Sequence, residues 1–180
     1  MPSFLNPDDM PDIAGLDCPR DFYVVCDEPV MICGMRKPPP SGFDWENLYS
    51  HGVSCVIRLN ERECDDYDPS PLKIVYSDQL EDLIHGGPPM ESNNEYGKIS
   101  AAVESAIECI ENGEGFVVHC FGGRGRTGSV LGCLLVHLGF ESELVIGYLN
   151  SLHKKRGKSG WPESPWQAEL VNQFNLDSST

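Results

Sequence analysis

Short apolar runs alternate along the chain with longer segments whose apolar residues recur every three or four positions. The short runs are rich in β-branched and aromatic residues, which favours strands. We expect strands at residues 22–26, 30–34, 55–60, 73–77 and 115–120. The last of these runs, "GFVVHC", is apolar at nearly every position, which is typical of a strand buried on both faces.

The longest helical pattern covers residues 93–111, where apolar residues share one face and Gly113 follows the last turn. Shorter helices are expected at 125–138, 142–153 and 165–174, and Asp44 is suited to cap another short one. Strands that alternate with helices predict a single α/β domain, with a central, mostly parallel sheet of about five strands flanked by helices. The strand at 115–120 is expected at its centre, and such sheets bind ligands at the carboxyl ends of their strands.

The N-terminal segment combines acidic residues and prolines with few apolar positions. We interpret residues 1–20 as an acidic, flexible tail and residues 21–176 as the folded domain. A chain of 180 residues is long enough for one such domain with a sizeable core.

The charge balance limits the partners that the chain can bind. It contains 28 acidic residues against 13 lysines and arginines, a formal net charge of −15. This balance argues against a nucleic acid or an anionic membrane as the main partner, because both need extended positive charge. The longest apolar stretch is too short to span a bilayer, so we expect no membrane insertion. Any anion site must be built locally.

The eight cysteines are scattered without paired spacing, and the N-terminus lacks the basic start and apolar core of a signal peptide. We therefore expect a reducing, cytoplasmic setting in which most thiols are free.

The segment "VVHCFGGRGRTGS", residues 117–129, carries the candidate chemistry. A strand ends at Cys120, a glycine-rich loop follows, and a helix begins near Gly125. Loop amides and the helix N-terminus form a cradle for a tetrahedral oxyanion. The same field stabilises a Cys120 thiolate, and the Arg126 guanidinium can grip two oxygens. Thr127 can donate a hydrogen bond to the departing thiolate. This combination suits attack on phosphorus through a phosphocysteine intermediate.

Three other interpretations explain less of this segment. The pattern G-x-G-x-x-G at 123–128 occurs in dinucleotide-binding folds, but the expected second strand ending in an acid is missing. A nucleotide-triphosphate loop needs a lysine that the segment lacks. An inert buried cysteine leaves the two arginines and four glycines unexplained.

The stretch "HCFGGRGRTG" resembles the signature loop of the cysteine-dependent protein tyrosine phosphatase superfamily. It is most similar to the dual-specificity branch, especially the compact archaeal-type and kinase-associated phosphatases. The resemblance covers about residues 22–174 and implies a phosphatase-like fold. It assigns Cys120 as nucleophile, Arg126 as phosphate clamp, Thr127 as the hydroxyl after the arginine, and His119 as a residue that orients the loop. The implied substrate-binding residues are Phe121, Gly122, Gly123, Arg124 and Gly125.

The resemblance also implies a general acid on an earlier loop, and "QLEDLIHGGPPMES" is the segment that fits. Related forms read roughly "EDxxPP" or "DGGxP". The first form makes Asp82 the acid, whereas the second places His85 in the position of the aspartate. We favour Asp82, keep His85 as the alternative and rank Asp78 third. In "WPESPWQ", Gln167 is a candidate for placing the attacking water or for packing against the loop, and a plain helix-surface role fits equally well.

The implied activity is hydrolysis of phosphotyrosine and/or phosphoserine and phosphothreonine in proteins, by a monomer. Two alternatives stay open: a phosphatase for phosphoinositides or other non-protein phosphomonoesters, and a phosphate-binding module with little turnover. Arg124 supplies only half of the basic pattern found in lipid-directed relatives. The basic run at residues 154–158 could recruit an acidic phosphopeptide or be a solvated helix end.

The five histidines are scattered and form no cluster with cysteines, so we expect no metal and no other cofactor. Activity should therefore be insensitive to chelators. A reactive Cys120 should be sensitive to peroxide, and whether a second thiol such as Cys64 protects it is left open.

Overall fold

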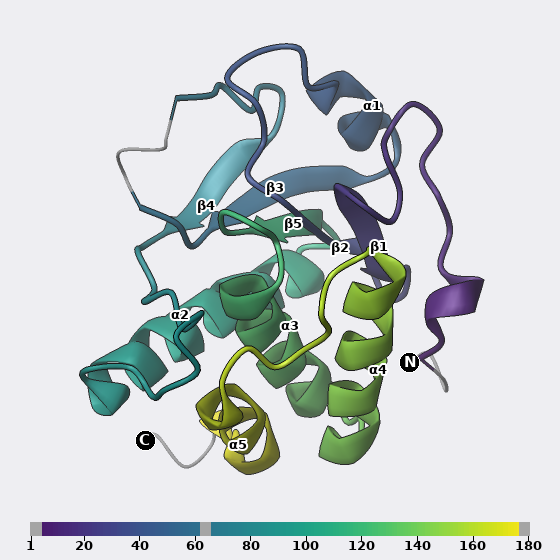
Figure 1. Cartoon of the computed structure of the whole chain (residues 1–180). Helices are drawn as coiled ribbons and strands as arrows, with labels where there is room; N and C mark the ends of the chain where they lie inside the picture. Colours follow the sequence, from purple (N-terminus) through teal and green to yellow (C-terminus); the bar gives the residue numbers. More distant parts are fainter. Residues whose placement is uncertain (1–4, 62–65, 177–180) are drawn as a thin grey trace.

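The computed structural model describes residues 5–61 and 66–176, so Cys64 lies outside the described residues. Five strands form one sheet in the order β1-β2-β5-β3-β4 (Figure 1). β1 and β2 pair antiparallel because only a short connection joins them, while the other three pairs are parallel. The strands are β1 (Phe22–Cys26), β2 (Ile32–Met35), β3 (Val53–Arg58), β4 (Lys73–Ser77) and β5 (Gly115–His119).

Helices cover both faces of this sheet. In Figure 1, α2 to α5 lie below the sheet and α1 lies above it. The described helices are η1 (Pro7–Asp9), α1 (Trp45–Ser50), α2 (Ser92–Glu111), α3 (Gly125–His137), α4 (Ser142–Lys155) and α5 (Pro165–Gln173). Asp44 caps α1 as expected, since its carboxylate accepts from the Asn47 amide at 3.0 Å. Within the described ranges, no helix is long and apolar enough to cross a membrane.

The core has two parts, one on each face of the sheet. Phe116 and Val118 of β5 point into the larger cluster beneath the sheet, whereas Val117 between them joins the cluster around α1. β5 is therefore buried on both faces and lies at the centre of the sheet, as predicted. The predicted fold class is confirmed, and element boundaries differ from the expectation by only one or two residues.

Residues 5–20, which the sequence analysis interpreted as part of a flexible tail, contact the domain at several points. Leu5 and Ile13 are buried, in the larger and smaller clusters respectively. The Lys155 ammonium of α4 binds the Pro7 carbonyl at 3.1 Å and the Asp8 carboxylate at 3.0 Å. Single apolar residues separated by acids give no periodic signal, so the sequence pattern does not reveal that this segment packs on the domain.

Truncating Ile13 tests this packing. Ile13→Ala should lower the free energy of unfolding by about 2–4 kcal/mol, because a buried side chain is replaced by a cavity. Denaturant unfolding of the full chain measures this change. The neighbouring exposed Asp12→Ala is the control, with an expected change within about 0.5 kcal/mol. Equal small changes in both variants would mean that Ile13 does not contribute to the core.

Candidate active site

Cys120 lies directly after the central strand and lines a cavity of about 290 Å³. Its sulfur is nearly covered, with 2% of the residue exposed, and accepts a hydrogen bond from Thr127 Oγ1 at 3.2 Å. Thr127 and Arg126 sit in the first turn of α3. The sequence-predicted thiol, hydroxyl and guanidinium are thus brought together by one strand–loop–helix unit.

Hydrogen bonds from other parts of the chain to its carbonyl oxygens hold the phosphate loop, residues 121–126, in place. The guanidinium of Arg156 donates to the carbonyls of Gly122 at 3.2 Å and Gly123 at 2.9 Å. The Tyr23 hydroxyl donates to the same Gly123 carbonyl at 2.6 Å. Further donors bind the other carbonyls from 119 to 125: Leu59 N, His119 Nδ1, Lys37 N, Gly128 N, Trp161 Nε1 and Ser129 Oγ.

These contacts fix the direction of the amides. In a trans peptide the carbonyl and the following N–H point in opposite directions, so carbonyls bound on the outside turn the next amides inward. Among the described residues, the amides of 121–125 donate to no protein group. They are therefore available to an anion in the cavity. Gly123 has φ +70°, and a Cβ there would lie 2.4 Å from the Met35 carbonyl oxygen, so no other residue fits without a shift.

The guanidinium of Arg126 is 5% exposed and is paired with two carboxylates. Its Nη1 lies 2.9 Å from Glu61 Oε1, and its Nη2 lies 3.7 Å from Asp82 Oδ2. Burial alone lowers the pKa of Arg126, but the charges of Cys120, Glu61 and Asp82 outweigh it and raise that pKa above its usual value. The arginine is thus permanently charged and oriented beside the thiol.

His119 is completely buried behind Cys120. Its Nδ1 lies 3.1 Å from the Cys120 carbonyl, which can only accept, so this nitrogen carries the proton. Its Nε2 then accepts from the Tyr67 hydroxyl at 2.6 Å. Burial lowers the pKa of His119 to about 4, so the ring is neutral near pH 7 and hydrogen-bonds the Cys120 carbonyl at the start of the loop.

The two general-acid candidates lie in different environments. Asp82 lines the cavity beside Cys120, and its second carboxylate oxygen accepts from the Ile84 amide at 3.1 Å. His85 does not line the cavity. Its Nδ1 accepts from the Gly87 amide at 2.9 Å, and its Nε2 faces Glu81 at 3.9 Å. The geometry therefore favours Asp82.

The contacts of Gln167 match neither of the two active-site roles considered for it, placing the attacking water or packing against the phosphate loop. It is 1% exposed, and its Oε1 accepts from the amides of Glu163 at 2.8 Å and Ser164 at 3.3 Å. This is the capping box of α5, which leaves the side chain outside the cavity. Gln167 holds the preceding loop in place and is not positioned to place a water. A capping box was readable from Ser164 and Gln167 three residues apart.

Arg124 lines the cavity as expected, but its charge is paired. Its Nε lies 3.1 Å from Glu163 Oε1, and its Nη1 donates to Ser159 Oγ. Glu163 therefore competes with a substrate for this guanidinium.

The basic run at 154–158 divides into different roles. Arg156 is buried and supports the phosphate loop, while Lys155 holds the N-terminal segment. Lys158 lines the cavity. Sequence analysis missed the loop-bracing roles of Arg156, Tyr23 and Tyr67, because these residues come from distant parts of the chain.

A protein-family model described as "PTP-SAK: Swiss Army Knife protein, DSP-PTPase phosphatase domain" matches residues 28–160. The chain belongs to this dual-specificity phosphatase family. The predicted membership of the protein tyrosine phosphatase superfamily is thereby confirmed, and the domain is of the phosphatase type.

Several relatives resemble this dual-specificity phosphatase. Cyclin-dependent kinase inhibitor 3 of Rattus norvegicus is 29% identical over 133 residues, 73% of this chain and 61% of the relative. The chain spans about three fifths of the length of the curated relatives it matches. TpbA of P. aeruginosa, solved in complex with pTyr, has a TM-score of 0.62 and 12% identity, covering 98% of this chain and 93% of TpbA. PTPMT1 in complex with PI(5)P has a TM-score of 0.59 and 18% identity, covering 82% and 92%. These structural likenesses establish the fold.

The buried neutral His119 predicts a pH-dependent stability. Its pKa is near 6.5 when unfolded and about 4 when folded, so the unfolded state binds the proton first as the pH falls. The stabilisation from neutral His119 is present above pH 6.5 and is lost toward pH 4, by roughly 3 kcal/mol. Denaturant unfolding at several pH values should show a shallower decline for His119→Gln than for the parent. Parallel curves would contradict a buried, neutral His119.

Proposed function

We propose that this dual-specificity phosphatase hydrolyses phosphotyrosine and/or phosphoserine and phosphothreonine in proteins through a phosphocysteine intermediate. The observation that carries the proposal is the arrangement of the Cys120 sulfur and the Arg126 guanidinium around one ring of free amides. Such a ring binds three phosphoryl oxygens while the sulfur faces the phosphorus atom.

The first step is in-line attack. The Cys120 thiolate forms the S–P bond as the bond from phosphorus to the leaving oxygen breaks. Arg126 and the amides of residues 121–125 hold the negative charge that spreads over the phosphoryl oxygens. Asp82, at the cavity wall, donates a proton to the leaving oxygen of the substrate side chain.

The second step releases phosphate. Asp82, now ionised, takes a proton from water as the water oxygen attacks phosphorus and the S–P bond breaks. The Thr127 hydroxyl, 3.2 Å from the sulfur, donates to the thiolate that leaves. The step restores both Cys120 and a protonated Asp82. Asp82 gives up one proton in the first step and recovers one from water in the second, so the protons balance over the two steps.

A basic groove beside the catalytic cavity supports a protein substrate. This groove, of about 700 Å³, shares Phe121, Gly122 and Lys158 with the cavity. Its other charged walls are Arg20, Asp21, Arg36, Lys37 and Arg156, and the prolines at 38–40 complete it. Positive charge is therefore concentrated here on a chain whose net charge is −15.

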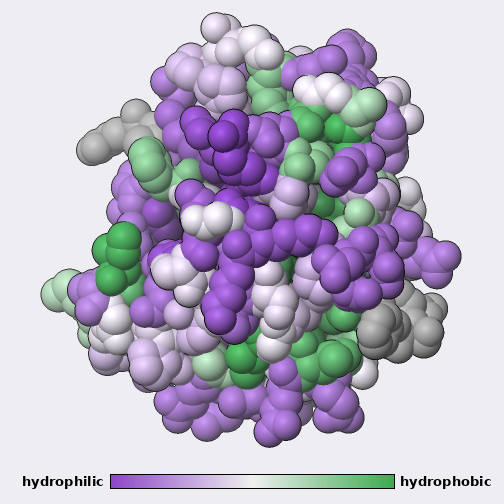
Figure 2. All heavy atoms as spheres, turned by 45° about the vertical axis from the view of Figure 1, so that its right-hand side comes forward, coloured by the Kyte–Doolittle hydropathy of each residue, from purple (hydrophilic) through white to green (hydrophobic). Residues whose placement is uncertain are grey.

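Partial neutralisation of the groove favours a polypeptide over a densely charged small molecule. Arg20 and Arg36 share Asp21, and Lys37 is paired with Asp66 at 2.9 Å. The remaining positive charge is thus suited to binding a few carboxylates of a substrate rather than several adjacent phosphates. Figure 2 shows a mostly hydrophilic face whose apolar residues form small separate patches. At the cavity itself, the exposed Phe121 and Ile84 offer apolar contacts to the substrate side chain.

Phosphoinositides are the second candidate, because PTPMT1, a structural neighbour, was solved with PI(5)P. A monomeric state and a cytoplasmic location stay predictions from the sequence.

Loss of the nucleophile should abolish turnover. Cys120→Ser should reduce kcat for p-nitrophenyl phosphate to background, while Cys18→Ser, a thiol outside the cavity, should retain activity. Phosphate release is the measurement. A fully active Cys120→Ser variant, or an inactive parent chain, would exclude the proposed reaction.

Removing the general acid should affect poor leaving groups most. Asp82→Asn should lower kcat for phosphotyrosine by about 10²–10⁴-fold, with a smaller loss for p-nitrophenyl phosphate. His85→Gln is the matched control and should retain both activities and the alkaline limb of the pH–rate profile, which the ionisation of the general acid produces. If His85→Gln shows the larger loss, the roles of the two residues are reversed.

The groove predicts a preference among substrates. Arg36→Ala should raise KM for a phosphopeptide with flanking acidic residues, with unchanged kcat/KM for p-nitrophenyl phosphate. Lys154→Ala is the control, because the Lys154 side chain lines neither the catalytic cavity nor the basic groove. Faster hydrolysis of PI(5)P vesicles than of phosphopeptides by the parent chain would favour the lipid alternative.

A further inference from the structure

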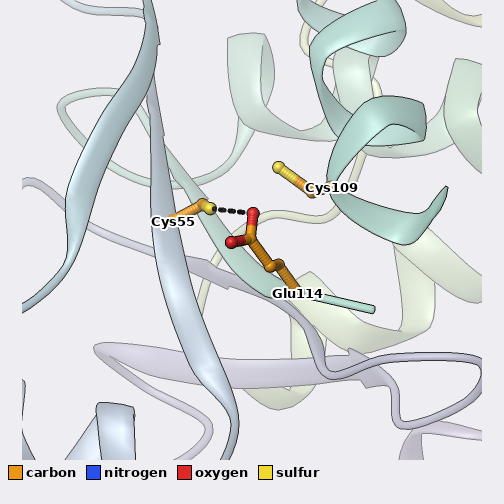
Figure 3. Close-up of side chains that lie close together, drawn as sticks. All are labelled: Cys55, Cys109 and Glu114. Atoms are coloured by element: carbon orange, nitrogen blue, oxygen red, sulfur yellow. Dashed lines mark hydrogen bonds between the residues drawn. The ribbon is translucent and has the colours of Figure 1, made fainter. Parts of the chain in front are cut away.

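Three side chains with metal-binding atoms meet near the amino ends of β3 and β5, at the opposite end of β5 from Cys120. Cys55 comes from β3, Cys109 from the last turn of α2, and Glu114 from the segment between α2 and β5. Their sulfur and carboxylate atoms all lie within 4.8 Å of one another. Figure 3 shows the two sulfurs and the carboxylate directed toward a common centre.

The spacing is close to that of a tetrahedral zinc site. Zinc bonds of about 2.0–2.3 Å to sulfur and oxygen place neighbouring ligand atoms about 3.3–3.8 Å apart. Cys55 Sγ and Glu114 Oε2 are already 3.3 Å apart. Both cysteines are buried in the core, so the fold itself holds their thiols beside the carboxylate. Only small side-chain rotations are needed to bring all three atoms to bonding distance.

The charges also balance around a divalent cation. Two thiolates and one carboxylate carry −3, and the Lys73 ammonium lies 3.2 Å from Glu114 Oε1. Adding a divalent cation to these four groups gives a neutral set.

A fourth coordination position and an entry path are present. A cavity of about 250 Å³ borders the cluster and is lined by Cys109, Glu114 and the exposed Glu108. Water can reach a bound cation from this side. A disulfide between the two cysteines would not explain why the Glu114 carboxylate lies within hydrogen-bond distance of the Cys55 sulfur.

We propose that Cys55, Cys109 and Glu114 bind one soft divalent cation, Zn²⁺ by preference, as a structural site. β5 separates Glu114 from Cys120 by six residues, or about 20 Å, so the cation takes no part in phosphoryl transfer. It ties β3 and α2 to the start of the strand that carries the nucleophile. Residues so distant in sequence give no local motif, which is why the sequence analysis expected no metal.

Cobalt binding tests this site without relying on catalysis. The full chain with Cys120→Ser, which removes the active-site thiol, is reduced, stripped with a chelator and titrated with Co²⁺. One equivalent should produce thiolate-to-cobalt charge-transfer absorption and the visible bands of tetrahedral Co²⁺. Zn²⁺ should displace it, and Zn²⁺ at about 100 times its dissociation constant should raise Tm by about 5–10 °C.

Matched variants in the same background locate the ligands. Cys55→Ser and Cys109→Ser should abolish the charge-transfer absorption, and Glu114→Gln, at a partly exposed position, should weaken binding at least about tenfold. Cys33→Ser removes a buried thiol of β2 outside the cluster and should leave binding unchanged. Absence of charge transfer in the parent, or an unchanged spectrum in Cys109→Ser, would overturn the proposal.

Discussion

The hydrogen bonds from outside the phosphate loop to its carbonyl oxygens are the constraint on which the site depends. Each carbonyl from His119 to Gly125 has a donor, so the peptide planes cannot turn over. The amides that follow must then point into the cavity. An anion site arises in this way from backbone amides on a strongly acidic chain. Preorganised amides need no rearrangement when charge develops on a phosphoryl group.

Much of the surrounding fold serves to deliver those donors. β1 brings the Tyr23 hydroxyl, the end of α4 brings Arg156, and the loop before α5 brings Trp161 Nε1. Arg156 also binds the carbonyls of Pro19 and Arg20, so the N-terminal segment is part of the same network. Its buried guanidinium has only carbonyls, a histidine nitrogen and the Tyr23 ring as described partners, with no carboxylate. Its positive charge therefore remains uncompensated beside the loop and favours an anion there.

The sequence was informative where the chemistry is local. Cys120, Arg126 and Thr127 lie within eight residues, and a strand–glycine loop–helix pattern alone requires them to share one concavity. Strand and helix periodicity likewise predicted the sheet and its central strand. What the sequence could not reveal are contacts made across the sheet. Arg156 belongs to a run of basic residues that is indistinguishable from a solvated helix end, and Ile13 is a single apolar residue among acids. The cluster of Cys55, Cys109 and Glu114 is assembled from three separate segments, so no short sequence motif predicts it.

The most direct test of the central claim is a crystal structure of the full chain with vanadate. The vanadium atom should lie within bonding distance of Cys120 Sγ, with its equatorial oxygens bound by the amides of residues 121–125 and by both terminal nitrogens of Arg126. Vanadate bound elsewhere, or loop carbonyls turned toward the cavity in place of the amides, would contradict the account.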